Sequence, residues 1–197
     1  GAQQKGGQRQ ARLRRLEREQ RGGNAAAYAC RTFAQVDLRQ YDNAGLMRKT
    51  GAAANALAMP LTNTGTLRVE EGVLTASAFP VNDGRLTLMN GATLVTGNAN
   101  LLNNGRIDGI GTVNVGTGTL TNAGLLQPGG AGAAGLLTIQ GNLLQTVAGS
   151  LEADLLGTSL GQQDQLQISG SVALGGNLVI TPAAGVTAIP AADASAL

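Results

Sequence analysis

The stretch Asn82-Asp-Gly-Arg-Leu86 is one of four copies of an Asn-x-Gly-x-Leu/Ile motif. The other copies are Asn63-Thr-Gly-Thr-Leu67, Asn103-Asn-Gly-Arg-Ile107 and Asn122-Ala-Gly-Leu-Leu126. Successive copies begin 19, 21 and 19 residues apart. Self-similarity at about 20 residues is typical of a chain built from stacked units, each burying its apolar face against its neighbours. The motif therefore predicts a solenoid.

Alignment of the four copies produces columns that repeat from one coil to the next. In a parallel β-helix, equivalent residues of successive coils lie about 4.8 Å apart, so the last motif position becomes an inward-pointing aliphatic ladder. The first position is able to form a ladder of side-chain amides. The Gly column is expected at a corner whose backbone conformation disfavours a Cβ atom. The flanking positions, which include Asp108 and Gln127, vary as solvent-facing positions do.

The composition fits this architecture. Among 197 residues there are two Phe, two Tyr and no Trp, so aromatic side chains cannot fill a core, and Leu, Val, Ile and Ala must do so. Thirty Gly residues suit a fold with frequent tight turns, since Gly accepts the backbone angles that such turns need.

The charge distribution divides the chain into different segments. Residues 1–60 carry eleven Lys and Arg against four Asp and Glu, whereas the remainder carries three against eight. Residues 9–21 contain only good helix formers, so we expect 1–60 to be a basic arm or cap that is helical or disordered. A nucleic-acid or membrane-surface role for this arm is an alternative, but a solvated arm is favoured. The β-helix is predicted over 61–182 and a frayed tail over 183–197.

The segments that follow the fourth motif show a family resemblance. They are Gly124-Leu-Leu-Gln-Pro-Gly-Gly, Gly135-Leu-Leu-Thr-Ile-Gln-Gly-Asn-Leu-Leu-Gln-Thr, Gly149-Ser-Leu-Glu-Ala-Asp-Leu-Leu-Gly, Asp164-Gln-Leu-Gln-Ile-Ser-Gly and Ala173-Leu-Gly-Gly-Asn-Leu. Together they resemble the passenger regions of bacterial autotransporters and related surface β-helix proteins. The resemblance covers about residues 61–182. It implies an all-β, right-handed parallel β-helix, export through the outer membrane, and an anchoring β-barrel in the full-length chain. The chain begins with Gly1 rather than Met, as expected of a fragment.

The residue inventory excludes several kinds of chemistry. With no His, a Ser/His/Asp or Cys/His nucleophile system cannot form, and the single Cys30 cannot supply a zinc site or an internal disulfide. The two lysines, Lys5 and Lys49, are predicted outside the repeat region without a serine partner. The Gly-rich stretch 129–135 is not followed by the Lys-Ser/Thr of a phosphate-binding loop, so phosphate binding is not predicted there.

The carboxylates are candidates for a catalytic cluster, because β-helix enzymes that act on polysaccharides use Asp and Glu from adjacent coils. Asp83 and Asp108 have no acidic neighbour in their own columns, and Glu70 and Glu71 would point to opposite faces of a strand. The three carboxylates of Glu152, Asp154 and Asp164 are able to pair or to hold a cation, but a solvated outer face is favoured. No catalytic, cofactor-binding or metal-ligating residue is therefore predicted.

These observations favour a surface-exposed or secreted scaffold, with a structural stalk or adhesive role and without catalysis. A β-helix enzyme acting on polysaccharide, or a glycan-binding module, is the alternative. The expected partner is a host-surface protein or a glycan that meets the outward polar columns. Neither nucleic-acid binding nor direct membrane insertion by this segment is expected, since no apolar stretch approaches the roughly 20 residues of a membrane span.

Overall fold

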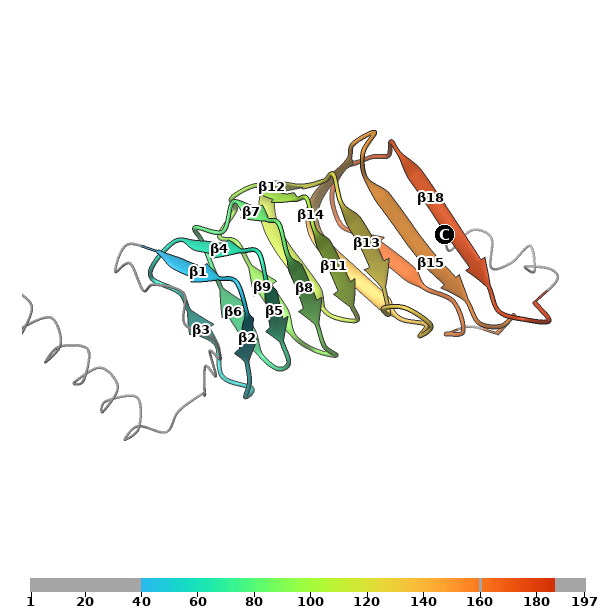
Figure 1. Ribbon diagram of the computed structural model, residues 1–197, viewed down its shortest axis with the longest axis horizontal. Helices are drawn as coiled ribbons and strands as arrows, with labels where there is room; N and C mark the ends of the chain where they lie inside the picture. The colour runs from blue at the N-terminus through green and yellow to red at the C-terminus, as the bar shows by residue number, and fades with distance from the viewer. Residues whose placement is uncertain (1–39, 160, 187–197) are drawn as a thin grey trace, which may run out of the picture.

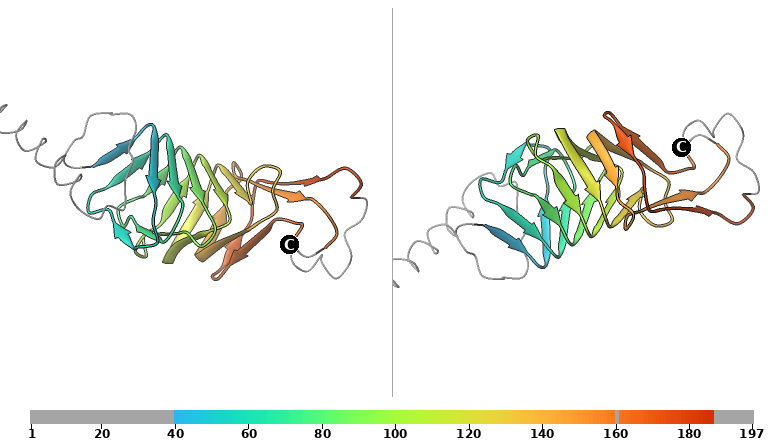
Figure 2. Two further views of the ribbon diagram at one scale, coloured as in Figure 1. Left: turned by 90° about the horizontal axis from the view of Figure 1, so that it is seen from below. Right: turned by 90° about the horizontal axis from the view of Figure 1, so that it is seen from above.

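The described residues of the computed structural model, 40–159 and 161–186, form an elongated parallel β-helix (Figure 1). The chain makes up to three short strands in each coil, and successive coils stack along the long axis of the molecule (Figure 2). Equivalent strands of adjacent coils pair in parallel throughout the two sheets. The predicted all-β, parallel β-helical fold is thus confirmed.

One sheet has seven strands, one from each coil. In order along the axis they are β2 (Leu46–Lys49), β5 (Thr66–Val69), β8 (Arg85–Leu88), β11 (Arg106–Gly109), β13 (Leu125–Pro128), β15 (Ser150–Leu155) and β18 (Asn177–Pro182). The Leu/Ile position of every motif copy lies in this sheet. We call it the seven-stranded sheet.

The other two sides of each coil belong to a single eleven-stranded sheet. One flank contains β1 (Tyr41–Asn43), β4 (Leu61–Asn63), β7 (Val81–Asn82), β10 (Leu101–Asn103) and β17 (Val172–Ala173). The second flank contains β3 (Asn55–Ala56), β6 (Val73–Thr75), β9 (Thr93–Val95) and β16 (Gln165–Ile168). Two long strands, β12 (Thr112–Asn122) and β14 (Leu136–Gln145), pass through the corner and join the flanks.

The aliphatic ladder predicted from the motif is confirmed. Its four residues pair in register on consecutive strands, and each is 0% exposed: Leu67, Leu86, Ile107 and Leu126. Residues from the other sheet complete the core, including Leu74, Leu94 and Val113 on the second flank. Each coil therefore buries its apolar side chains against the coils before and after it.

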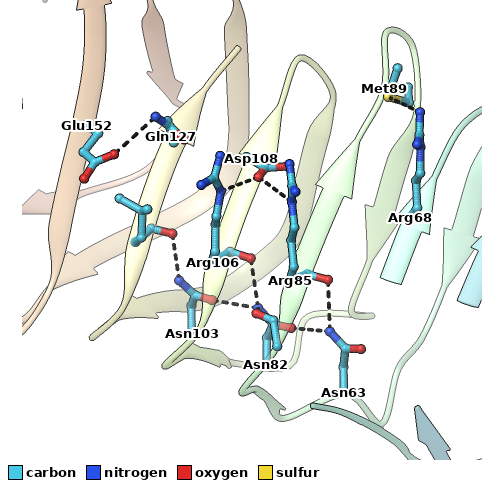
Figure 3. Close-up of polar contacts among 12 residues, drawn as sticks. Asn63, Arg68, Asn82, Arg85, Met89, Asn103, Arg106, Asp108, Gln127 and Glu152 are labelled. Carbon is cyan, nitrogen blue, oxygen red and sulfur yellow. Dashed lines mark hydrogen bonds and ion pairs between the residues drawn. The ribbon is translucent and has the colours of Figure 1, made fainter. Parts of the chain in front are cut away.

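The Asn column forms the expected amide ladder (Figure 3). The Nδ2 group of Asn63 donates to Oδ1 of Asn82 at 2.7 Å, and Asn82 and Asn103 donate to the next Asn of the column, each at 2.8 Å. All the side chains from Asn43 to Asn122 in this column are buried. Gln145 takes the next place, receiving a longer bond of 3.4 Å from Asn122. The ladder satisfies polar groups that the core would otherwise leave unpaired.

The Gly column has a different cause from the one expected. Gly65, Gly84, Gly105 and Gly124 are absent from the residues with positive φ in the described chain, so a left-handed conformation does not require glycine there. Instead, a Cβ atom on Gly105 would lie 2.0 Å from the carbonyl oxygen of Gly84 in the preceding coil. Glycine is needed because the backbones of adjacent coils approach closely at this corner.

The solenoid begins earlier than predicted. The strands β1, β2 and β3 lie within residues 1–60, so the expectation of a helical or disordered arm was wrong for residues 41–56. Asn43-Ala-Gly-Leu-Met47 is a fifth motif copy in which Met47 replaces Leu or Ile, and Met47 pairs with Leu67. The helix predicted at 9–21 and the Cys30 thiol lie outside the described residues.

Among the described residues, the far end of the stack is open. Strand β18 pairs with β15 on one side, and its inward residues Leu178 and Ile180 are 62% and 39% exposed. Residues 183–186 form a turn after Pro182. The rest of the tail predicted over 183–197 lies outside the described residues. The last described coil therefore presents apolar side chains that an interior coil would cover.

Candidate functional site

Every arginine in the described part of the chain lies on the outer face of the seven-stranded sheet. Arg48, Arg68, Arg85 and Arg106 occupy the consecutive strands β2, β5, β8 and β11. Arg48 is in register with Arg68, and Arg85 with Arg106, and the two pairs are offset from each other by two residues along the strands. Since successive residues of a strand point to opposite faces, these side chains point away from the aliphatic ladder. We call the row formed by these four residues the arginine row.

The first two arginines share one carboxylate. Arg48 donates to Glu70 through Nε at 2.9 Å and through Nη2 at 2.7 Å, while the Arg68 Nε atom lies 3.2 Å from Glu70 Oε1. The hydrogen bonds from Arg48 lower the pKa of Glu70, and the same contact raises the pKa of Arg48. The pairing offsets the repulsion between two guanidinium groups on adjacent strands.

The second two arginines also share a carboxylate (Figure 3). The Nε atoms of Arg85 and Arg106 both contact Oδ2 of Asp108, the former at 2.8 Å. Asp108 was predicted to face solvent, but it is 1% exposed, because the two arginine side chains cover it. The sequence showed its outward strand position correctly but not its burial.

The outward-facing column that contains Asp108 continues with polar residues in the next coils. Gln127 is in register with Asp108, and its Nε2 group donates to Glu152 Oε2 at 3.2 Å. Gln127 is also buried, at 5% exposed, contrary to the expectation of a solvated position. The outer face of this sheet is thus a connected polar surface that runs along the solenoid axis.

The predicted trio of acidic residues is only partly assembled. Asp154 and Asp164 lie together, whereas Glu152 accepts a hydrogen bond from Gln127 on the arginine-bearing sheet. The expectation of a solvated face was wrong for this pair, since Asp154 is 8% and Asp164 is 1% exposed. Both carboxylates accept bonds from the backbone of the Gly-rich loop, from Gly132 N at 2.7 Å and Gly135 N at 2.9 Å.

These contacts show how the Gly-rich stretch 129–135 is held in place. It connects β13 to β14, and the two carboxylates hold it against β15, where Asp164 also accepts the backbone N–H of Asp154 at 2.9 Å. Burial raises the pKa of Asp164 to about 6; the backbone bonds act in the opposite direction, and the neighbouring Asp154 charge adds to the increase. The carboxylate oxygens of Asp154 and Asp164 thus hold the Gly-rich loop in place by accepting hydrogen bonds from its backbone.

We expect this pair to make stability depend on pH. Because the pKa of Asp164 rises from 3.8 to about 6 on folding, its contribution is fully present below pH 4 and is lost as pH rises to about 6. Relative to Asp164→Asn, the wild-type free energy of unfolding should fall by about 1–2 kcal/mol over this interval, after allowance for solvent screening. Urea unfolding at pH 4, 5, 6 and 7 measures this difference.

The control for that experiment is Asp83→Asn, since Asp83 lies at an exposed turn and bonds to Asn104. The control should leave the pH profile of wild type unchanged between pH 4 and pH 6. Parallel profiles for wild type and Asp164→Asn would contradict the assignment of the raised pKa to this carboxyl group.

Lys49 is inside the solenoid, contrary to its predicted place outside the repeats. It is 1% exposed and occupies the inward column of Val69 and Leu88. Its Nζ group donates to three backbone carbonyls, those of Thr50, Gly51 and Glu71. An ammonium with three donors is satisfied there, so Lys49 closes the core at the first coil. Lys5 lies outside the described residues.

A shallow groove of about 450 Å³ lies beside the Gly-rich loop. The residues that line it include Asn90, Ile110, Thr112, Leu136 and Thr138. Ile110 is 36% and Leu136 is 40% exposed. The groove mixes polar and apolar groups and opens widely to solvent, so it is less enclosed than the usual site for a small molecule.

Two other kinds of site are absent from residues 40–159 and 161–186. In this part of the chain, no three side chains of the His, Cys, Asp or Glu type come together as potential metal ligands. The same residues contain no helix with the length and apolarity that a membrane crossing needs. The arginine row, together with Glu70 and Asp108, brings six charged side chains together on one face of the described structure.

Comparison with known proteins found no match, since no protein-family model, no curated protein and no solved structure is significantly similar to this chain.

Proposed function

We propose that this chain is part of an exported bacterial surface protein of the autotransporter-passenger kind, and that its β-helix acts as a stalk or adhesive scaffold. The observation that carries the proposal is that the potentially reactive side chains make structural contacts within the solenoid. Glu70 and Asp108 pair with arginines, Asp154 and Asp164 hold a loop, and Lys49 closes the first coil. These groups maintain the architecture, which supports a structural role.

The geometry also suits a spacer. Each coil adds about 4.8 Å of length, and an interior coil has its backbone groups satisfied by its two neighbours. Such a stack extends in one direction without needing a larger core. The resemblance of residues 124–178 to passenger coils supports display at the cell surface, where such an extended body reaches away from the membrane.

A polysaccharide-active enzyme is the less favoured alternative. Glycoside hydrolysis commonly uses two carboxyl groups about 5–10 Å apart on either side of the scissile bond. The adjacent carboxylates of Asp154 and Asp164 are buried beneath the Gly-rich loop and accept bonds from backbone N–H groups. Substrate would have to displace that loop, so we favour a non-catalytic role.

Surface display is tested by placing a peptide epitope after Val147, which is 89% exposed in the turn between β14 and β15. The tagged protein is expressed in the source bacterium, and intact and permeabilised cells are stained with an antibody against the epitope. We expect staining of intact cells, or epitope in the culture medium. Staining that needs permeabilisation, with none in the medium, would contradict the proposal. A tagged cytoplasmic protein controls for leakage.

A further inference from the structure

The arginine row has free hydrogen-bond donors facing outward. In Arg85 and Arg106, the contact with Asp108 is made by Nε. Within the described structure, the terminal amino groups of these two side chains have no protein partner. Nε is the inner donor of a guanidinium group and the terminal amino groups are the outer ones. The carboxylate therefore anchors each group from beneath and leaves its outer edge available.

The charges of the row are arranged in layers. The side chains of Arg48, Arg68 and Arg85 are 42–49% exposed, whereas those of Glu70 and Asp108 are 19% and 1% exposed. Four guanidinium groups paired with two carboxylates leave the arginine row itself with a surplus of two positive charges. An approaching anion meets the guanidinium groups first, because the compensating negative charges lie below them.

Arg68 is the least satisfied member of the row. Its Nε atom lies 3.2 Å from Glu70 Oε1 as an ion pair but makes no well-aligned hydrogen bond, and its Nη2 atom contacts the sulfur of Met89 at 3.7 Å (Figure 3). Both oxygens of Glu70 accept hydrogen bonds from Arg48, so Arg68 shares this carboxylate with a neighbouring guanidinium group. A thioether is a weak acceptor, so an anionic oxygen would be a better partner for this guanidinium group.

We propose that the arginine row binds an anionic polysaccharide, whose carboxylate or sulfate groups lie along the solenoid axis over β2, β5, β8 and β11. Guanidinium groups suit such ligands, because their fork of donors matches the paired oxygens of these anions. Along the solenoid axis the row spans three inter-strand steps, about 14 Å, which gives one surplus charge per about 7 Å of axial length.

This spacing favours a polysaccharide over nucleic acid. Duplex DNA carries one charge per about 1.7 Å, far denser than the surplus on the row. Proteins that bind single strands add aromatic side chains on which bases stack. In the described residues, Phe79 is buried in the core, and Tyr41 is on β1 of the other sheet.

The test uses the full chain, because residues 1–39 contain nine further Lys and Arg residues that also attract polyanions. The variant Arg85→Gln/Arg106→Gln/Asp108→Asn removes two guanidinium groups together with the carboxylate beneath them, so no buried charge is left unpaired. A second variant, Arg48→Gln/Arg68→Gln/Glu70→Gln, does the same at the other pair. Ser77→Glu is the control, since it lowers the net charge by the same single unit at an exposed turn of the other sheet.

Binding is measured by titration calorimetry against heparin and polygalacturonate at several NaCl concentrations, with uncharged dextran and duplex DNA as comparisons. Circular dichroism and thermal unfolding establish which variants fold. We expect each triple variant that folds to bind at least one of the two polyanions about tenfold more weakly than wild type, with a shallower dependence on salt. Ser77→Glu should bind within about twofold of wild type.

Three results would overturn the inference. Equal binding by wild type and the triple variants would assign any affinity to residues 1–39, and equal binding of dextran would remove the role of charge. Tighter binding of duplex DNA with the same sensitivity to the variants would identify a nucleic-acid surface instead. The inference gives a ligand class to the proposed scaffold and rests on that function for its biological setting. Because binding is measured on purified protein, its failure is distinct from failure of epitope staining on cells.

Discussion

Alanine in place of Gly105 is expected to lower the free energy of unfolding by about 3–5 kcal/mol, or to prevent folding at 37 °C. Its Cβ atom would lie 2.0 Å from the Gly84 carbonyl oxygen and 2.8 Å from two backbone atoms of Asp83. All of these atoms belong to the backbone of the preceding coil, so no side chain can rotate away to relieve the clash. Urea unfolding followed by circular dichroism measures the loss.

The control is Gly91→Ala. Gly91 has φ of +74°, and an added Cβ atom would have nothing within 4 Å. This substitution tests the cost of a left-handed backbone without a clash, which is about 1–2 kcal/mol. If Gly105→Ala were no more destabilising than Gly91→Ala, close approach between coils could not be the reason for the Gly column.

The second large effect concerns the amide ladder. Asn103→Ala is expected to lower the free energy of unfolding by about 3–4 kcal/mol. The Asn103 side chain is 0% exposed, accepts a bond from Asn82 and donates to Asn122 and to the Leu125 carbonyl. Its removal leaves a cavity and interrupts a buried chain of hydrogen bonds, in which each bond also strengthens the next.

Two further variants separate hydrogen bonding from packing. Asn103→Leu fills the space without restoring the bonds, so it should remain nearly as destabilised as Asn103→Ala. Asn104→Ala alters the exposed neighbouring residue and should change stability by less than about 0.5 kcal/mol. If Asn103→Leu were as stable as wild type, the Asn column would require only side chains of suitable volume. The hydrogen bonds of the ladder would then not be the source of its stabilising effect.

The interior of the solenoid could be predicted from sequence because each coil repeats the same local rule. The positions of Leu86 and Ile107 follow from a fixed interval and a strand period of two. The first coil escaped detection because Met47 replaces the expected Leu or Ile, and because the surrounding residues have moderate helical propensity. Pairing with Leu67 in the next coil outweighs that local preference.

The candidate site was less accessible to prediction. Asp108 occupies an outward position, yet two arginines from its own and the preceding coil cover it. The Asp154 side chain also points outward, but it is covered by the Gly-rich loop, which precedes it in the chain by some twenty residues. Such burial depends on the direction of neighbouring side chains and on the path of a loop. Neither can be predicted from an alignment of the sequence repeats. The arginine row itself did leave a signal, since Arg85 and Arg106 occupy the same motif position.

The stacking of the coils has a mechanical consequence. Strand β1 and strand β18 lie at opposite ends of the molecule (Figure 1), and the pairing partners of each interior coil are the coils before and after it. A pulling force on the two ends is therefore carried by the coils in series, and the terminal coil is the first to detach. The paired residues of successive coils are 19 to 27 residues apart, so each detached coil would release about 60–90 Å of contour length. Under load, this domain would lengthen in discrete steps and so absorb work as an extensible tether.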